Sequence, residues 1–328
     1  MIARELVAIP DYAQEVVRGL TARPKTLPCK LFYDERGSAL FEEITRLTEY
    51  YPTRTEFEIL QQRSSEMVQA AGSPISVVEL GAGTATKTST LLRAVARRQI
   101  RVRYFPVDIS PTALTEAKER VQRDLPGAHV QPVIADFGNG FHFLGEIPGR
   151  KLVLYLGSSI GNFDPDDAAS LLRKVRERLS EGDALLLGTD MVKSPRVLVP
   201  AYDDAQGVTE QFNKNILWRI NRELGANFDL DSFHHIAEWN PRRSRMEIYL
   251  ESTRAQTVVL KLTRTTVKFA PGERIHTENS YKYTLEMVER MLCVSGFSLE
   301  KSWFDRRKWF GLHLARVGKT RNRIPMSF

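Results

Sequence analysis

Residues 77–92 read VVELGAGTATKTSTLL. The first four residues end an apolar, β-branched run over 75–80 that is typical of a buried strand, and residues 88–98 then carry apolar side chains at helical spacing. Gly81 and Gly83 stand between the two, where the backbone has to turn sharply and a Cβ would keep a ligand away. The stretch therefore predicts a strand, a ligand-binding loop and a helix.

The loop lacks the composition of a nicotinamide-binding loop. A dinucleotide site has a third small residue three positions after the second glycine, which brings the helix against the pyrophosphate. Here Thr86 occupies that position, and Lys87 follows it. The loop thus favours a cofactor with an adenosine moiety other than a nicotinamide dinucleotide.

The ends of the next two strands carry side chains that suit such a cofactor. Asp108 follows the strand expected over 102–107, and its carboxylate could bind two ribose hydroxyls. Asp136 and Phe137 follow the strand expected over 130–134, and they offer a carboxylate to an adenine amino group and a ring to stack beside the base. Taken singly, each could equally be a helix cap or a core residue. Together they should face one crevice, because open α/β sheets bind ligands beyond the carboxyl ends of their strands.

Strand and helix signals alternate along most of the chain, which predicts an α/β fold with a parallel sheet. Pro111 and Pro165 stand where a first helical turn accepts proline, behind Ser110 and Asp164 as expected caps. Strands are expected at 75–80, 102–107, 130–134, 152–156 and 184–187, and helices at 88–98, 111–123 and 166–179.

Two regions interrupt this alternation and should form a second, discontinuous α+β domain. These are residues 8–56, which read mainly as helix and turn, and residues 195–281. The sheet domain is then expected to comprise residues 57–194 and 282–328. Residues 195–281 contain strand candidates at 245–250, 257–262 and 265–269, and the tail reads as a helix at 285–293 with strands at 298–304 and 312–316, which could close the sheet as an antiparallel hairpin at its edge.

Composition is that of a folded, soluble protein, with 27% charged and 42% hydrophobic residues. The formal net charge of +7 would suit an anionic partner, but the basic residues are scattered and mostly interleaved with acids, so no nucleic-acid interface is expected. No apolar run approaches the roughly 20 residues of a membrane span, and the first residues do not resemble a secretory signal. We expect a cytoplasmic monomer that binds a small molecule and no membrane.

Metal and disulfide chemistry are not expected. Cys29 and Cys293 are the only cysteines, which are too few for a disulfide framework and lack the spacing of a zinc site. His234 and His235 suggest a metal site, but adjacent side chains project differently and no carboxylate stands at ligand spacing. We interpret all six histidines as structural or surface residues.

Longer, irregular strings resemble one family in particular. Residues 30–38, KLFYDERGS, and residues 47–56, LTEYYPTRTE, resemble the N-terminal signature of the ergothioneine-pathway L-histidine Nα-methyltransferases, which are class I S-adenosylmethionine-dependent enzymes. The resemblance covers nearly the whole chain and is much more specific than a glycine loop. Further matching strings lie at 156–163, 187–190, 201–205, 212–215, 221–224, 228–231 and 277–280.

This resemblance implies a Rossmann-like class I methyltransferase sheet with a second substrate domain. The implied reaction is trimethylation of the α-amino group of L-histidine to hercynine, the first step of ergothioneine biosynthesis. The residues implied to contact S-adenosylmethionine are Gly81, Lys87, Asp108, Asp136 and Phe137. Those implied to contact the amino acid are Tyr50, Gly157, Asn162, Tyr202, Glu278 and Ser280, and a direct part in catalysis falls to Tyr33, Asn162 and Glu278.

The chemistry of the residues themselves is compatible with these roles. Asn162 can offer an amide to a carboxylate or an amine. Glu278 and Ser280 alternate in an expected strand, so both would project from one face toward an imidazole. Without the resemblance, Tyr50 and the two residues after it read more readily as a turn, and Asn162 as a loop former. Methyl transfer is an in-line displacement that depends mainly on geometry, so no strong general base is required.

Two alternatives remain open. Ile248 stands where some relatives carry a methionine near the imidazole pocket, which leaves room for a methyltransferase of an indole-bearing amino acid. Glu278 makes an indole substrate less favourable, because a carboxylate that packs on the carbon skeleton of an indole loses its hydration without gaining a hydrogen bond in return. The alternative from another class is a nucleic-acid methyltransferase or a basic binding module, which weak salt dependence and the lack of an electrophoretic shift would exclude.

Overall fold

The computed structural model describes residue 10, residues 12–137 and residues 140–317. The chain divides into two compact units, each made of two separate stretches. Unit 1 comprises Met1–Tyr51 and Lys193–Ser280, and unit 2 comprises Pro52–Val192 and Tyr281–Phe328. These boundaries differ by a few residues from those expected, since residues 52–56 and residue 281 group with unit 2 and residues 193–194 with unit 1.

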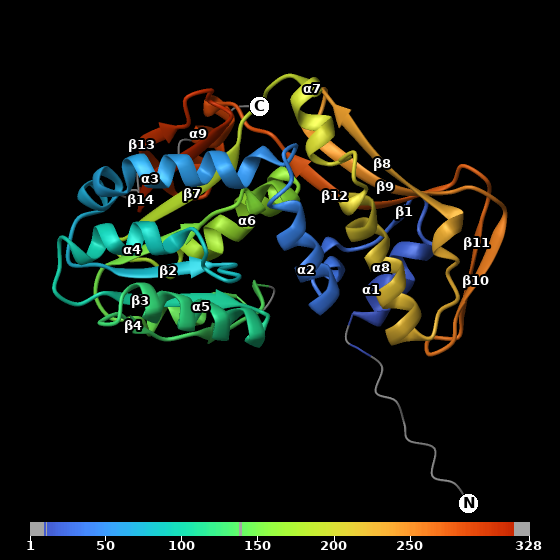
Figure 1. Ribbon diagram of the computed structural model, residues 1–328, viewed down its shortest axis with the longest axis horizontal. Helices are drawn as coiled ribbons and strands as arrows, with labels where there is room; N and C mark the ends of the chain where they lie inside the picture. Colours follow the sequence, from blue (N-terminus) through green and yellow to red (C-terminus); the bar gives the residue numbers. More distant parts are fainter. Residues whose placement is uncertain (1–9, 11, 138–139, 318–328) are drawn as a thin grey trace, which may run out of the picture. The chain divides into compact units, whose positions relative to one another are not determined.

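Unit 2 is built on an eight-stranded sheet (Figure 1) in the order β13-β14-β7-β6-β2-β3-β4, with β5 also paired to β3. β2 to β7 run parallel, whereas β14 lies antiparallel to both β7 and β13. The strand order reverses on either side of β2, which marks the point where such sheets bind ligands. The strands are β2 (Ser76–Leu80), β3 (Arg103–Asp108), β4 (His129–Val130), β5 (Val133–Ile134), β6 (Lys151–Tyr155), β7 (Ala184–Asp190), β13 (Phe297–Phe304) and β14 (Phe310–Val317).

Alternate residues of the unit 2 strands face two separate apolar cores. Val77 packs into one core with three helices, α3, α4 and α5, and its neighbour Val78 packs into the other with α6 and α9. This period of two follows from the strand pleat, and burial on both faces explains why these strands are continuous apolar runs. The helices are α3 (Tyr51–Ala71), α4 (Thr88–Ala96), α5 (Pro111–Asp124), α6 (Pro165–Arg176) and α9 (Leu285–Val294).

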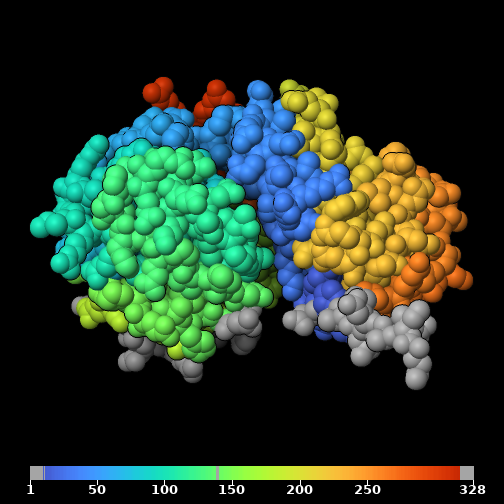
Figure 2. All heavy atoms as spheres, turned by 60° about the horizontal axis from the view of Figure 1, so that its bottom comes forward, coloured from blue at the N-terminus to red at the C-terminus, as the bar shows by residue number. Residues whose placement is uncertain are grey.

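Unit 1 combines a four-stranded sheet, in the order β1-β12-β9-β8, with a separate β10–β11 hairpin and several helices. Its core brings Ile216 and Leu217 against Leu250 and Ile275. Its yellow to gold segments, around residues 200–250, form much of its visible surface in Figure 2. Its elements are α1 (Ala13–Thr21), β1 (Lys25–Thr26), α2 (Glu35–Ile44), α7 (Pro195–Leu198), α8 (Val208–Leu224), β8 (Phe233–Asn240), β9 (Arg245–Ser252), β10 (Gln256–Leu260), β11 (Thr265–Phe269) and β12 (Arg274–Tyr281).

The expected α/β sheet and its antiparallel edge hairpin are confirmed, while other elements differ. The strand expected over 130–134 is two short strands, and Pro132, which lies between them, has no N–H to donate to a ladder. The region 195–281 is richer than expected, because α8 and β8 were not predicted. None of the helices in the described part of the chain combines the length and the apolar character that a membrane span needs.

The two expected helix caps behave differently. Ser110 caps α5, because its hydroxyl accepts from the backbone N–H of Ala113 at 3.2 Å. Asp164 occupies the N-cap position of α6, as expected, but its side chain makes no capping hydrogen bond. Its carboxylate instead accepts from the Tyr281 hydroxyl at 2.8 Å, which joins α6 to the start of the C-terminal stretch.

Candidate active site

The loop after β2, residues 81–87, is here called the cofactor loop. Gly81 and Gly83 adopt φ angles of +66° and +49°, which glycine tolerates without strain. A Cβ built on either glycine would meet no protein atom within 4 Å. The backbone of the loop therefore faces open space that a ligand can approach closely.

Asp108, at the end of β3, is held by two backbone donors. Its Oδ2 accepts from Gly83 N at 3.0 Å, and its Oδ1 accepts from Ser110 N at 3.0 Å. The backbone N–H of Ala135 donates to the Asp108 carbonyl at 3.1 Å, which brings the residues after β5 beside the end of β3. Three strand ends therefore meet at the cofactor loop.

Glu79 fixes the end of β2 to the start of α4. Its carboxylate is 4% exposed and accepts from the Thr88 hydroxyl at 2.7 Å and from the Tyr104 phenol. Burial raises the pKa of Glu79 to about 7, against the opposing effect of these two hydrogen bonds. The cofactor loop thus lies between the end of β2 and the start of α4, which the Glu79–Thr88 hydrogen bond joins.

Glu56 joins the cofactor loop to the loop after β6. Its carboxylate has no exposed surface and pairs with the Lys87 amine. The same carboxylate accepts from Gly157 N at 2.7 Å. One buried group therefore connects a residue predicted to contact the cofactor with one predicted to contact the amino acid. Glu56 itself had no predicted role, although it ends the family-like string 47–56.

Asp136 and Phe137 follow β5 directly. Asp136 is exposed, and Phe137 is partly buried against Phe141 and Tyr155, with ring centroids 5.5 Å and 6.2 Å away. The ring therefore contributes to the core of unit 2, as the structural interpretation of Phe137 expected. The ring is only partly buried and directly follows an exposed carboxylate in the chain, which is compatible with the cofactor interpretation.

Asn162 ends a short 3-10 helix, Ser159–Asn162, shortly after Gly157. The preceding residue, Gly161, allows a close backbone approach, because a Cβ there would lie 2.9 Å from the carbonyl oxygen of Tyr281. The segment that carries Asn162 is therefore packed directly on the chain at Tyr281. Asn162 itself is partly buried.

Unit 1 brings most of the other predicted residues together. The Tyr202 hydroxyl lies 2.8 Å from the Ser280 hydroxyl. Ser280 and Glu278 stand two residues apart on β12, so their side chains project from the same face of the strand. The strand thus presents a carboxylate and a hydroxyl together, with Tyr202 bound to the hydroxyl.

An aromatic cluster of five rings, Tyr33, Phe41, Tyr50, Tyr202 and Phe212, includes the remaining predicted residues. Phe41 lies 5.9 Å from Tyr33 and 6.1 Å from Tyr50 between ring centroids, and Tyr50 lies 6.4 Å from Tyr202. Phe212 of α8 lies 5.8 Å from Tyr33. The sequence reasoning missed Phe41 and Phe212, although Phe212 begins the family-like string 212–215.

The phenol of Tyr33 stays protonated at neutral pH. Desolvation, followed by the negative charge of Glu278, raises the pKa of Tyr33 well above its ordinary value. Its hydroxyl is therefore a neutral group that can form a hydrogen bond. The Tyr33 residue is 38% exposed, so a ligand can reach part of it.

The predicted residues are thus distributed over both units. Unit 1 contains Tyr33, Tyr50, Tyr202, Glu278 and Ser280, and unit 2 contains Gly81, Lys87, Asp108, Asp136, Phe137, Gly157 and Asn162. Within each unit, the contacts above bring most of these residues into one neighbourhood.

Residues 12–317 match the family model described as histidine-specific methyltransferase, SAM-dependent. The chain belongs to this family. The histidine N-alpha-methyltransferase of Mycolicibacterium smegmatis is 46% identical over 93% of this chain and 96% of that protein. The enzyme of the same name from Mycobacterium tuberculosis is 44% identical over 92% and 94% of the two chains. A more distant relative, the 4-dimethylallyltryptophan N-methyltransferase of Claviceps purpurea, is 28% identical over 88% and 90%.

The match to this family confirms the resemblance to L-histidine Nα-methyltransferases that the sequence indicated. It also confirms S-adenosylmethionine as the methyl donor. The structure fits this cofactor. The open space over Gly81 and Gly83 admits a ligand against the backbone, and Asp108 is already oriented beside it. These features match the adenosine-binding chemistry that the cofactor loop predicts.

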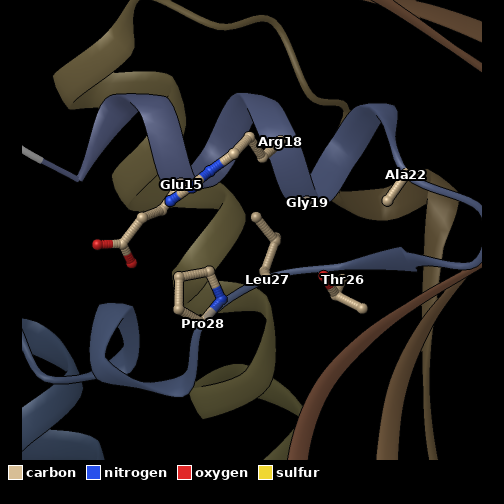
Figure 3. Close-up of a pocket in the computed structure, with 7 residues that line it drawn as sticks. All are labelled: Glu15, Arg18, Gly19, Ala22, Thr26, Leu27 and Pro28. Atoms are coloured by element: carbon tan, nitrogen blue, oxygen red, sulfur yellow. The ribbon is translucent and has the colours of Figure 1, made fainter.

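A surface pocket of unit 1 lies apart from the family's predicted residues (Figure 3). It lies where α1 passes over β1, at Gly19, where a Cβ would come 2.2 Å from the Thr26 carbonyl. Its acid, Glu15, already pairs with Lys30 at 2.8 Å. We assign it no role. Within residues 10, 12–137 and 140–317, no group of three or more metal-ligating side chains is placed to hold an ion.

Proposed function

We propose that this methyltransferase transfers three methyl groups, one at a time, from S-adenosylmethionine to the α-amino nitrogen of L-histidine. The product is hercynine, and the reaction is the first step of ergothioneine biosynthesis. The observation that carries the proposal is the Tyr202–Ser280 hydrogen bond next to Glu278 on β12, in a unit that also holds the aromatic cluster. This set offers a carboxylate to an imidazole N–H, hydroxyls to polar atoms and ring faces to a flat heterocycle.

In this proposal, the cofactor is held by residues of unit 2. The backbone at Gly81 approaches it, Asp108 accepts from the ribose hydroxyls, and Asp136 and Phe137 contact the adenine. Lys87, kept in place by Glu56, completes the set.

The amino acid is bound by its two ends. Glu278 and Ser280 hold the imidazole, with Tyr50 beside them, while Asn162 and Tyr202 bind the carboxylate and the amine. Gly157 contributes its backbone. Tyr33 orients the amine through its neutral hydroxyl.

The protein contributes geometry more than acid–base chemistry. S-adenosylmethionine supplies an electrophilic methyl group on a sulfonium. The amine needs its lone pair, so the ammonium form first loses a proton to solvent, and burial near a positive charge favours that loss. Asn162 and Tyr33 then keep the lone pair aligned, which is where most of the rate arises. Each added methyl removes an N–H, so polar contacts to the nitrogen decrease from one transfer to the next.

Methylation of an indole-bearing amino acid is less well supported. Its basis is the name of the Claviceps relative, together with Ile248, a branched side chain that is 2% exposed. Glu278 counts against it for the reason given above, since an imidazole N–H compensates a carboxylate better than a carbon skeleton does. We also propose a cytoplasmic monomer without a nucleic-acid partner, as its composition suggests.

A panel of the twenty amino acids tests the function. Incubated with S-adenosylmethionine, the protein should add one, two and three methyl masses to L-histidine alone, read by mass spectrometry. Glu278→Ala should reduce histidine use while S-adenosylhomocysteine binding persists, because Glu278 lies outside the cofactor residues. Mass gain on tryptophan with none on histidine would reject the assignment, and equal loss of cofactor binding and turnover in the variant would reject the role of Glu278.

A further inference from the structure

Two buried polar side chains of unit 1 have no place in the roles above. Asn213 on α8 and Thr277 on β12 are each 1% exposed. Both lie in family-like strings, 212–215 and 277–280. A buried amide or hydroxyl costs free energy unless it is hydrogen-bonded, so the partners of these groups indicate what they do.

The Asn213 amide can take only one orientation. Its Nδ2 lies 3.0 Å from the carbonyl oxygen of Tyr249, which can only accept a hydrogen bond. Its Oδ1 therefore faces Thr277, whose hydroxyl donates to it at 2.8 Å, with a longer contact of 3.1 Å to the Ile248 carbonyl. Reversing the amide would place two acceptors against each other at Tyr249.

This orientation determines the tautomer of His235 on β8. Asn213 Nδ2 also lies 2.9 Å from His235 Nδ1, so that nitrogen is the acceptor. The ring proton is then on Nε2, which lies 2.7 Å from the Tyr202 carbonyl oxygen and donates to it. The bonds run from Thr277 through Asn213 and His235 to Tyr202, and the Tyr202 hydroxyl returns to β12 at Ser280.

We propose that His235 is a positioning residue for the amino-acid substrate. It fixes the main chain of Tyr202, so that the phenol meets Ser280 in register with Glu278, while Asn213 and Thr277 keep His235 in the required tautomer. The inference rests on the proposed function, which assigns the substrate to Tyr202, Glu278 and Ser280. It gives one of the six histidines a more specific role than the sequence suggested.

The electrostatic surroundings are consistent with a neutral His235. Burial lowers the pKa of His235, and this effect exceeds the opposing effects of the Tyr202 carbonyl and of the carboxylates of Asp203, Glu210 and Asp204. A proton on Nδ1 would face the Asn213 NH₂ group, which cannot accept it. The neutral ring is therefore the form that the hydrogen-bond chain requires.

Steady-state kinetics of three variants test the proposal. His235→Phe removes both ring bonds and should raise the KM for histidine by about tenfold or more, the scale of a lost buried hydrogen bond, with little change in the KM for S-adenosylmethionine. His235→Gln keeps a donor near the position of Nε2 and should recover most of this loss. Thr277→Val, which is nearly isosteric, should also raise the KM for histidine, because it leaves the Asn213 oxygen without its donor. His234→Phe, on the exposed neighbouring residue, should behave as wild type.

The results separate this inference from the proposed function. Wild-type activity on histidine tests the function, whereas the ratio of variant to wild type tests the hydrogen-bond chain. An unchanged KM for histidine in His235→Phe, or parallel loss of histidine and S-adenosylhomocysteine affinity, would overturn the role of His235. If His235→Phe does not fold by circular dichroism, Thr277→Val decides the question by the same criterion.

Discussion

Glu56 of α3 links the cofactor loop to the loop after β6. Its side chain is fully buried, and Lys87 and Gly157 both bind its carboxylate. Glu56→Gln keeps the shape but removes the charge. We expect S-adenosylhomocysteine affinity to fall about tenfold, because charge-assisted bonds are roughly twice as strong as neutral ones and Lys87 loses its counter-ion. Isothermal titration calorimetry measures the change.

Glu58 provides the matched control for this variant. It lies two residues further along α3 and is partly exposed, 3.5 Å from the exposed Arg306. Surface ion pairs of this kind contribute little to stability. Glu58→Gln should therefore bind S-adenosylhomocysteine as wild type does. Equal effects of the two substitutions would show that Glu56 has no special role.

The positions of the cofactor loop and of Asp108 at strand ends could be predicted because their signals are local. Gly81, Gly83 and Asp108 lie at strand ends that a short apolar run identifies, and the loop follows directly. Glu56 could not be predicted in the same way, since its burial depends on Lys87, 31 residues away, and on Gly157, 101 residues away. A glutamate within a helix otherwise faces solvent.

The missed elements, α8 and β8, have patterns that hide them. The buried side of α8 includes Asn213 and Asn215, so its apolar period is interrupted. β8 reads FHHIAEWN and is partly buried along most of its length, without clean alternation. The parallel strands of unit 2 were found because they are buried on both faces and therefore uniformly apolar.

The start of α5 depends on one capping bond. Ser110→Ala removes the hydroxyl that accepts from Ala113 N and should cost about 1 kcal/mol in the free energy of unfolding. Chemical denaturation measures the loss. Thr112→Ala, at an exposed position in the first turn, should change the stability much less. A larger effect at Thr112 than at Ser110 would contradict the assigned cap.

His313 makes the stability of the whole protein depend on pH. It is fully buried on β14, 2.8 Å from the Thr189 hydroxyl and 2.8 Å from the Ser302 hydroxyl. Burial lowers the pKa of His313 from 6.5 to about 4. Between these values, the unfolded chain binds a proton at His313 that the folded chain excludes. The protein therefore loses stability as the pH falls below 6.5, whereas above pH 6.5 the contribution of His313 stays constant.

Replacing this histidine tests the dependence. Between about pH 7 and about pH 5, wild type should lose about 2 kcal/mol more in the free energy of unfolding than His313→Gln. Urea unfolding at about pH 7 and about pH 5 provides both values. His129→Gln, at an exposed histidine on β4, should retain the wild-type dependence. Identical pH profiles for His313→Gln and wild type would rule out the assigned titration.

The position of β14 in the sheet also has a consequence for biosynthesis. β14 hydrogen-bonds β7 on one side and β13 on the other, although β7 ends at Asp190 and β14 begins only at Phe310. A nascent chain emerges at about 5–20 residues per second, so β7 waits several seconds or longer at the ribosome with an unpaired edge. The whole of residues 193–280 is made during that wait. Unit 1 therefore has all its residues before unit 2 does, and β14, the last strand in the described part of the chain, completes an interior position of the sheet.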